Sequence, residues 1–241
     1  MIALFTDFGP HGPYLGQMRL VLAGCAPDCP VVDLLNDAPA FDPTASAHLL
    51  AALTPDLPRA SVLLGVVDPG VGTHRAPVAL QADNRWYVGP DNGLFDVVAA
   101  RAEQASWYDI TWRPDRLSTS FHGRDLFAPV AGHLADGGDP AQRLAPRAAA
   151  AVADADRSAV IYIDDYGNAM TGLQPRTWPM ETRLLAAQRH LSRAETFGAV
   201  APGEAFWYVN SLGLAEVAVN QGSAADQLGL AVGDSVTVID P

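Results

Sequence analysis

The sequence predicts a mixed α/β fold, in which an N-terminal α/β domain with a mainly parallel central sheet precedes a smaller, β-barrel-like C-terminal domain. Up to residue 110, short aliphatic runs alternate with segments of helical apolar spacing. Beyond residue 157, strand-like runs follow one another between glycine turns. The stretch 135–157 is rich in Ala, Pro, Gly and Asp, so we expect domains over residues 1–150 and 158–241.

The N-terminal domain is expected to alternate strands and helices. Strands are predicted from short aliphatic and β-branched runs at residues 2–6, 31–35, 61–67, 78–81, 86–88 and 107–110. Helices are predicted from apolar spacing at residues 14–23 and 43–53 and toward residue 134. Gly24 is a typical stop for the first helix, and Asp42 before Pro43 is a typical N-cap for the second.

The C-terminal domain is expected to consist mainly of strands. They are predicted at residues 159–163, 183–186, 206–209, 216–219 and 235–239, with one short helix at 224–228. Between residues 135 and 157 no strand is expected. Short strands separated by turns are typical of a small barrel or sandwich.

The composition argues against several classes of partner. All fifteen basic residues are arginine, and the net charge is −12. This acidity disfavours nucleic acid and anionic membrane surfaces and favours a cationic ligand. No apolar run approaches a membrane span and no basic leader precedes the first strand, so we expect a cytoplasmic protein. Cys25 and Cys29 are expected to be reduced, buried thiols rather than half of a metal site.

Three aspartates that follow predicted strands are candidates for a ligand site: Asp7, Asp68 and Asp164. In α/β sheets the loops beyond the carboxyl ends of parallel strands carry the reactive groups. Asp164 lies in the second domain, so it could join the others only across a domain or subunit interface. The alternative for each aspartate is a turn or N-cap role, and Asp-Pro-Gly at Asp68 is a common turn sequence.

The residues after Asp68 do not match a known nucleotide-binding loop. Gly70 and Gly72 lack the third glycine of a dinucleotide fingerprint because Arg75 stands in its place, and the chain has no lysine for a P-loop. His122 lies in a turn before a predicted helix, near the expected crevice. Capping or surface exposure is the default role of the histidines in helix-like segments, which are His48, His133 and His190.

Six motifs occur in order over nearly the full length: FTDFG, VVDPGVGTxR, PDNGL, FHGRDxFAP, IDxxGN and NSxGxxExAxNQGSAA. Together they resemble the S-adenosylmethionine (SAM) hydroxide adenosyltransferases, or SAM hydrolases, which are relatives of the fluorinase and chlorinase. The resemblance implies an N-terminal α/β domain, a C-terminal β-barrel-like domain and a homotrimer that binds SAM between neighbouring subunits. It also implies hydrolysis of SAM to adenosine and L-methionine, with SAM as the substrate and with no cofactor or metal.

The resemblance further implies roles for individual residues. The family's catalytic set matches Asp68, Arg75 and His122, whereas halogenases usually carry another residue in place of the aspartate. The implied substrate-binding residues are Asp7 and Phe41 at the ribose, Asn168, Val219 and Phe197 at the adenine, and Asp164, Asn210, Ser211 and Glu216 at the methionine portion. For Phe41 and Phe197 the alternative is core packing. Gly12 and Leu212 depart from the family pattern in stretches expected to touch the methionine portion.

The chemistry of SAM explains these residue types. Its sulfonium is already an activated leaving group, so the requirement falls on the nucleophile, and water must be oriented in line and lose a proton. In this interpretation His122, with Asp68, accepts or relays that proton. Arg75 stabilises hydroxide character and holds the Asp68 carboxylate by a forked contact.

Three other functions remain as alternatives. Halide-dependent 5′-halogenation is disfavoured because the Asp68 carboxylate would repel a halide. A SAM- or adenosine-binding protein with little turnover is kept open by the change at Gly12. A metallohydrolase using Asp68, His74 and His122 is the general alternative, which insensitivity to chelators would exclude.

Overall fold

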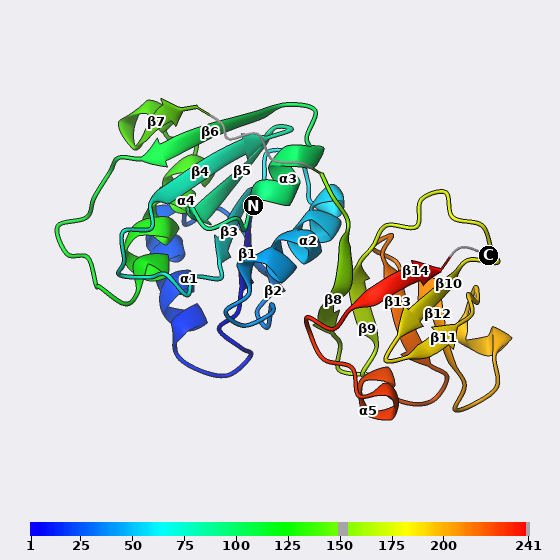
Figure 1. Ribbon diagram of the computed structural model, residues 1–241. Helices are drawn as coiled ribbons and strands as arrows, with labels where there is room; N and C mark the ends of the chain where they lie inside the picture. The colour runs from blue at the N-terminus through cyan, green and yellow to red at the C-terminus, as the bar shows by residue number, and fades with distance from the viewer. Residues whose placement is uncertain (149–153, 240–241) are drawn as a thin grey trace. The chain divides into compact units, whose positions relative to one another are not determined.

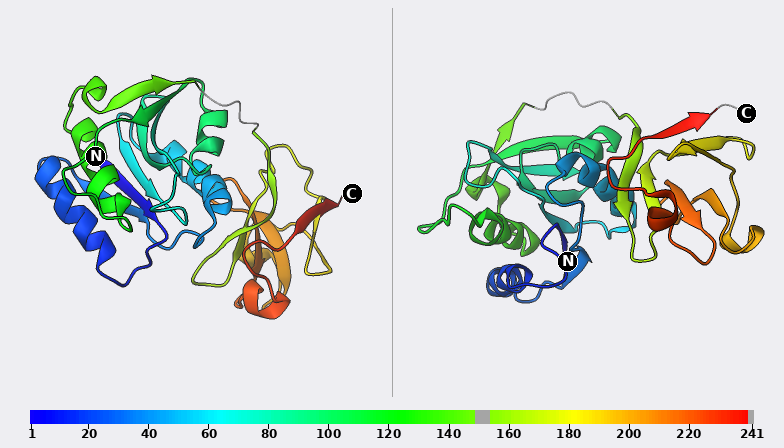
Figure 2. Two further views of the ribbon diagram at one scale, coloured as in Figure 1. Left: turned by 60° about the vertical axis from the view of Figure 1, so that its left-hand side comes forward. Right: turned by 60° about the horizontal axis from the view of Figure 1, so that its bottom comes forward.

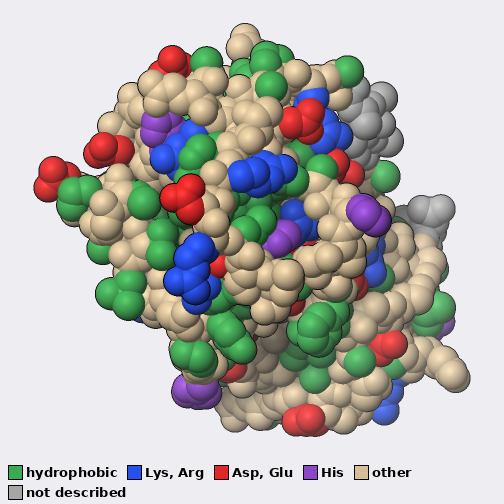
Figure 3. All heavy atoms as spheres, turned by 90° about the vertical axis from the view of Figure 1, so that its left-hand side faces the viewer, with side chains coloured by type: hydrophobic (Ala, Val, Ile, Leu, Met, Phe, Trp, Pro, Cys, Tyr) green, Lys and Arg blue, Asp and Glu red, His purple; other side chains and the backbone are tan. Residues whose placement is uncertain are grey.

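The computed structural model describes residues 1–148 and 154–239 and divides into two compact units, Met1–Asp154 and Ala155–Pro241 (Figure 1). Within the described residues, every helix is too short or too polar to span a bilayer. On the face drawn in Figure 3, acidic, basic and hydrophobic side chains are interspersed. On that face, therefore, the net charge of −12 is not gathered into one acidic field.

One seven-stranded sheet forms the centre of the N-terminal unit, in the order β2-β1-β3-β5-β4-β6-β7. Strands β1, β2, β3 and β5 pair in parallel, while β4 and β7 run against their neighbours, so five of the seven strands point the same way. The predicted mainly parallel sheet is confirmed. The strands are β1 (Ile2–Thr6), β2 (Val31–Leu35), β3 (Val62–Val66), β4 (Pro77–Ala82), β5 (Arg85–Pro90), β6 (Ala105–Ile110) and β7 (Leu144–Arg147).

Helices cover both faces of this sheet. Helix α1 (Tyr14–Cys25) packs with α4 (Ala128–Ala135), and α2 (Pro43–Leu53) packs with α3 (Asp96–Arg101). Figures 1 and 2 show the first pair on one face of the sheet and the second pair on the other. This arrangement explains why every residue of β1 and β3 is buried, since central parallel strands are covered from both sides.

The core between the sheet and α1 and α4 is closely packed. Leu4, Leu64, Met18 and Phe127 are fully buried there. Each such side chain contributes roughly 1.5–3 kcal/mol to the free energy of unfolding. The strand ends that carry the candidate residues therefore stand on a rigid base.

The strand register places two candidate aspartates at one edge of the sheet. Thr6, the last residue of β1, pairs with Val66, the last residue of β3. Asp7 and Asp68 follow these positions by one and two residues. Both therefore leave the sheet at the carboxyl ends of neighbouring parallel strands, as expected for an α/β site.

The C-terminal unit consists of two antiparallel sheets, with the orders β12-β13-β9-β8 and β11-β10-β14. Both contribute to one core around the fully buried Trp207. Isolated bridges link the two sheets at both sides, Ala159 with Ser235 and Arg193 with Trp207, which gives a barrel-like arrangement. The elements are β8 (Arg157–Ile163), β9 (Ala169–Gly172), β10 (Arg183–Ala186), β11 (Arg189–Leu191), β12 (Ala205–Val209), β13 (Ala215–Val219), α5 (Ala224–Leu228) and β14 (Val236–Ile239).

Several elements differ from the sequence expectations. Strand β7 lies in the stretch where the composition predicts none. It is an edge strand that contains Pro146 and pairs only with β6, so its formation depends on that neighbour rather than on local propensity. Helix α1 continues through the exposed Gly24 to Cys25. The short elements α3, β9 and β11 were not predicted, because each is too short to carry a periodic pattern.

Some individual side chains also differ. Cys25 and Cys29 are free thiols, as expected, but both are half-buried rather than buried. His48 is buried in α2 rather than capping or exposed, because residues 45–52 of that helix are buried all round. His190 lies in strand β11 and not in a helix.

Candidate active site

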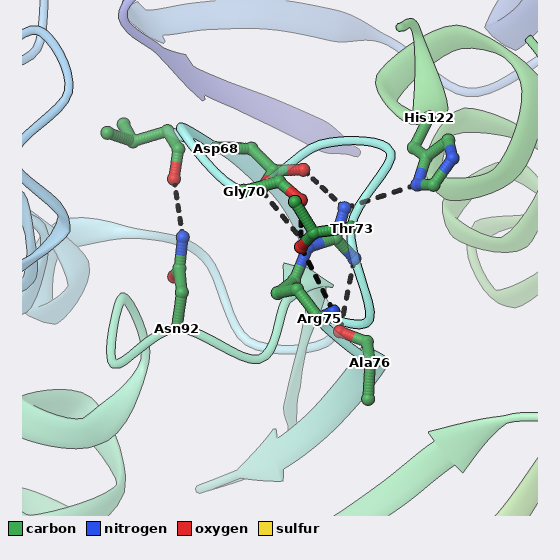
Figure 4. Close-up of polar contacts among 8 residues, drawn as sticks. Asp68, Gly70, Thr73, Arg75, Ala76, Asn92 and His122 are labelled. Carbon is green, nitrogen blue, oxygen red and sulfur yellow. Dashed lines mark hydrogen bonds and ion pairs between the residues drawn. The ribbon is translucent and has the colours of Figure 1, made fainter. Parts of the chain in front are cut away.

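The loop that follows β3 carries a buried ion pair between Asp68 and Arg75 (Figure 4). The Nε of Arg75 donates to Oδ1 of Asp68 at 3.0 Å, and Nη2 donates to Oδ2. Only 4% of the Asp68 side chain and 7% of the Arg75 side chain are exposed. A forked contact between two desolvated groups holds the carboxylate in one orientation.

The shape of this loop depends on local hydrogen bonds. The hydroxyl of Thr73 donates to the carbonyl of Gly70 at 2.7 Å and accepts the backbone N–H of Arg75 at 3.3 Å. Gly72 has a φ of +77°, and a Cβ there would lie 2.5 Å from the carbonyl oxygen of Thr119. Only glycine satisfies both conditions, so the loop returns Arg75 toward Asp68.

His122 completes the cluster from the π-helical turn Gly123–Phe127 that leads into α4. Its Nδ1 lies 3.2 Å from Nη2 of Arg75. A guanidinium can only donate, so Nδ1 is the acceptor and the neutral ring carries its proton on Nε2. Burial, followed by the positive charge of Arg75, lowers the pKa of His122. The arrangement therefore favours a neutral imidazole with one N–H donor.

Asn92 supports the end of β3, although its motif PDNGL carried no assigned role. Its Nδ2 donates to the carbonyl of Val67 at 2.8 Å, directly before Asp68 (Figure 4). Its Oδ1 accepts from the N–H of Leu94 at 3.3 Å. The side chain thus ties the loop after β5 to the end of β3. The motif PDNGL has the composition of an ordinary turn, so the sequence did not predict this long-range contact.

A cavity of about 440 Å³ lies beside this cluster. Asp68, His122, Asp7 and Phe41 all contribute to its lining. The Oδ2 of Asp7 accepts the N–H of Phe41 at 3.1 Å, and burial raises the pKa of Asp7. Phe41 is 77% exposed with a φ of +60°, so it is not a core residue. Aromatic rings of Phe8, Tyr14 and Phe121 pack against one another along the same cavity.

A second cavity, of about 690 Å³, lies within the C-terminal unit. The Oδ1 of Asp164 accepts the N–H groups of Tyr166 and Asn168 at 2.9 and 2.8 Å, and its Oδ2 accepts Nδ2 of Asn168 at 3.0 Å. The Oδ1 of Asn168 is buried without a hydrogen-bond partner among the described residues. Since a buried polar atom is costly to leave unpaired, this oxygen points to a ligand donor.

The other candidates of the C-terminal unit divide into two groups. Phe197 and the buried Val219 also line the second cavity, and Phe197 packs edge-on against Phe206 and Tyr208. Glu216 and Asn210 hydrogen bond to each other at 2.6 Å outside the cavity lining. Ser211 is exposed beside them.

A metal centre gains no support from the described side chains. Among them, no group of three or more His, Cys, Asp or Glu residues is placed to hold an ion. His74 is exposed, and both Asp68 oxygens already contact Arg75.

Comparison with known proteins decides the family. The model of the SAM hydroxide adenosyltransferase N-terminal domain matches residues 2–144, and that of the C-terminal domain matches residues 158–237. The chain belongs to the SAM hydroxide adenosyltransferase family. Within this family, the chain is 38% identical to the (R)-S-adenosyl-L-methionine hydrolases of Thermus thermophilus and Salinispora tropica. The comparison covers 99% of both chains for the former, and 98% of this chain and 97% of the relative for the latter.

Two solved structures share the fold of this chain over its whole length, and a fluorinase is a more distant relative. An uncharacterized conserved protein from Thermotoga maritima superimposes with a TM-score of 0.90 at 29% identity, over 100% of both chains. A conserved hypothetical protein from Thermus thermophilus does so with a TM-score of 0.79 at 36% identity, over 99% of both chains. A fluorinase from Nocardia brasiliensis is 23% identical over 57% of this chain and 54% of its own.

Proposed function

We propose that this protein hydrolyses SAM at C5′ to give adenosine and L-methionine. The observation that carries the proposal is the buried Asp68 and Arg75 pair, with the half-buried His122 in contact with Arg75, beside a cavity that Asp7 also lines. Relatives that match nearly the whole chain at 38% identity are named SAM hydrolases. An enzyme that catalyses this reaction needs a pocket for a cationic ligand and side chains that activate water. The cluster and its cavity meet both requirements.

In this reaction the attacking water, rather than the leaving group, must be activated. Methionine leaves C5′ as a neutral thioether, so the sulfonium needs no further activation. Water has a pKa of about 15.7 and must be aligned with the C5′–S bond and lose a proton as the C–O bond forms. In this step the negative charge of the attacking oxygen and the positive charge of the sulfonium both decrease, so a desolvated pocket favours the reaction.

The geometry favours roles for His122 and Asp68 that differ from those expected from the sequence. Since Nδ1 of His122 accepts from Arg75, the neutral ring offers only the Nε2–H donor and orients the water rather than taking its proton. The remaining acceptor is a free lone pair of the Asp68 carboxylate, which Arg75 holds in place. In this mechanism the water proton passes to Asp68 and then to solvent.

The substrate-binding roles are proposed from the same family pattern. Asp7 holds the ribose hydroxyls with Phe41 packed on the sugar, and Asn168 and Phe197 hold the adenine, with the backbone near Val219. Asp164 faces the methionine ammonium, while Asn210 and Ser211 lie toward its carboxylate. From the family resemblance we also propose a homotrimer that shares sites between subunits and needs no cofactor, and from the composition we propose a cytoplasmic location.

Product analysis tests the hydrolysis directly. Purified protein is treated with EDTA, incubated with SAM with and without excess chloride or fluoride, and its products are separated by chromatography. Adenosine and methionine are expected in equal amounts under all conditions. A 5′-halo nucleoside would indicate halogenation, loss of turnover with EDTA would indicate a metal, and bound but intact SAM would indicate a binding protein.

The activity is expected to decline at acidic pH, with an apparent pKa below the ordinary histidine value of about 6.5. Burial and Arg75 lower the pKa of His122, although Asp68 and Asp125 act in the opposite direction. Protonation would place an N–H on Nδ1 against the Arg75 donor. The pH profile of kcat/KM measures this effect, and an acidic limb at or above pH 6.5 would contradict it.

The same shift gives a stability prediction of defined sign. The folded protein binds the His122 proton more weakly than the unfolded chain does. The contribution of His122 to stability is therefore complete above about pH 6.5, and it is lost as the pH falls through the folded-state pKa.

A further inference from the structure

A buried carboxylate outside the catalytic cluster has two fixed hydrogen-bond partners. Glu216, on β13, is 2% exposed. Its Oε1 accepts the hydroxyl of Tyr208 at 2.5 Å, and its Oε2 accepts Nδ2 of Asn210 at 2.6 Å. Burial raises the pKa of Glu216, and these two donors act in the opposite direction because they stabilise the ionised form. Tyr208 and Glu216 face each other directly across the antiparallel pair of β12 and β13.

The orientation of the Asn210 amide is set by the backbone. Its Oδ1 accepts the N–H groups of Leu212 and Leu214 at 2.9 and 3.0 Å. Because backbone N–H groups can only donate, the oxygen of Asn210 must face them and its NH₂ group must face Glu216. The direction of the hydrogen bonds that run from Asn210 through Glu216 to Tyr208 is therefore fixed at Asn210.

The consequence appears at the second cavity, which Tyr208 lines and Glu216 does not. The only proton of the Tyr208 hydroxyl is directed at Glu216, so its oxygen offers lone pairs alone to the cavity. Burial, followed by the contact with Glu216, raises the pKa of Tyr208, so the phenol keeps this proton.

Two other groups in this cavity are acceptors for the same kind of reason. Asn168 uses Nδ2 to donate to Asp164, which leaves its buried, unpartnered Oδ1 as the group available to a ligand. Asp164 is itself a carboxylate. The side chains of Asp164, Asn168 and Tyr208 thus present acceptors in one cavity.

We propose that Tyr208 is a specificity-determining residue, whose phenol oxygen accepts a hydrogen bond from an N–H group of the ligand, and that Glu216 and Asn210 are the positioning residues that impose this polarity. The proposal rests on the proposed function for the ligand, SAM. SAM has two such groups, the α-ammonium of its methionine portion and the exocyclic amine of its adenine. The acceptor lining excludes a ligand that presents a carbonyl or carboxylate at that point.

The substitution Glu216→Gln reverses this polarity without changing shape. The amide introduced at position 216 must place its oxygen toward the NH₂ of Asn210, since two donors cannot face each other. The NH₂ of the introduced amide then donates to Tyr208, and the phenol proton turns toward the cavity. A donor then opposes the ligand's N–H group, whereas Tyr208→Phe merely removes the acceptor.

Binding of SAM, measured by calorimetry and as KM, tests the proposal. Tyr208→Phe is expected to weaken binding about fivefold, and Glu216→Gln about 30-fold. In the double variant, Glu216→Gln should add little to Tyr208→Phe, because no hydroxyl remains to be reversed. The matched control, Glu181→Gln, makes the same change at an exposed site away from the cavity and should bind as the wild type does.

Two SAM analogues identify the group that is read, one with a 6-oxopurine in place of adenine and one without the α-amino group. The loss of affinity caused by Glu216→Gln should disappear for one analogue and remain for the other. A penalty of equal size for both analogues, or wild-type binding by Tyr208→Phe, would overturn the proposal. If the wild type binds SAM without hydrolysing it, the proposed function fails and the variant series still decides this inference, whereas absence of SAM binding would overturn both.

Discussion

Replacing Arg75 by alanine is expected to reduce turnover of SAM by about 10³-fold and to lower the free energy of unfolding by about 3–5 kcal/mol. Both effects have one cause. Asp68 is 4% exposed and both of its oxygens bond to Arg75, so the variant leaves a buried carboxylate without its countercharge. The substitution also removes the donor to Nδ1 of His122, which sets the ring tautomer.

Urea unfolding and single-turnover kinetics measure the two effects separately. Arg75→Lys retains the charge but cannot form the forked contact, so we expect intermediate stability and a large loss of rate. Arg19→Ala is the matched control. It also breaks an arginine and aspartate pair, but the side chains of Arg19 and Asp33 are 49% and 23% exposed, so a loss below about 1 kcal/mol is expected. Similar losses for Arg19→Ala and Arg75→Ala would contradict the role of burial.

Replacing Gly89 by alanine is expected to destabilise the N-terminal unit by about 3 kcal/mol, at the upper end of overpacking effects. A Cβ at Gly89 would lie 2.2 Å from the backbone oxygen of Gly65 and 2.9 Å from the ring of Phe95. Gly65 and Gly89 lie on the parallel neighbours β3 and β5, so the clash would separate two central strands. The ends of these strands carry Asp68 and the loop of Asn92, so turnover should decline as well.

Thermal unfolding of Gly89→Ala should show a Tm lower by about 10 °C. Gly24→Ala is the control, because a Cβ there meets no atom within 4 Å and alanine has the higher helix propensity. It should leave the Tm unchanged or raise it slightly. An unchanged Tm for Gly89→Ala would show that the two strands can separate without cost.

The sequence alone determined the features that depend on neighbouring residues. The bounds of β1, β2, β10 and α5 follow from short apolar runs and turn residues. The N-cap at Asp42, which accepts the N–H of Ala45 at 2.8 Å, follows from a side chain and backbone three residues apart. The ordered motifs also predicted the family, because each is a local string of residues.

Only the tertiary structure decided the features that depend on distant partners. Strand β7 forms because β6 offers a free edge, and the tautomer of His122 is set by Arg75, 47 residues earlier in the chain. The polarity of Tyr208 depends on Glu216, which the sheet register places opposite it. A local pattern carries no record of such contacts, since the direction of a hydrogen bond is set by which donors and acceptors the fold brings together.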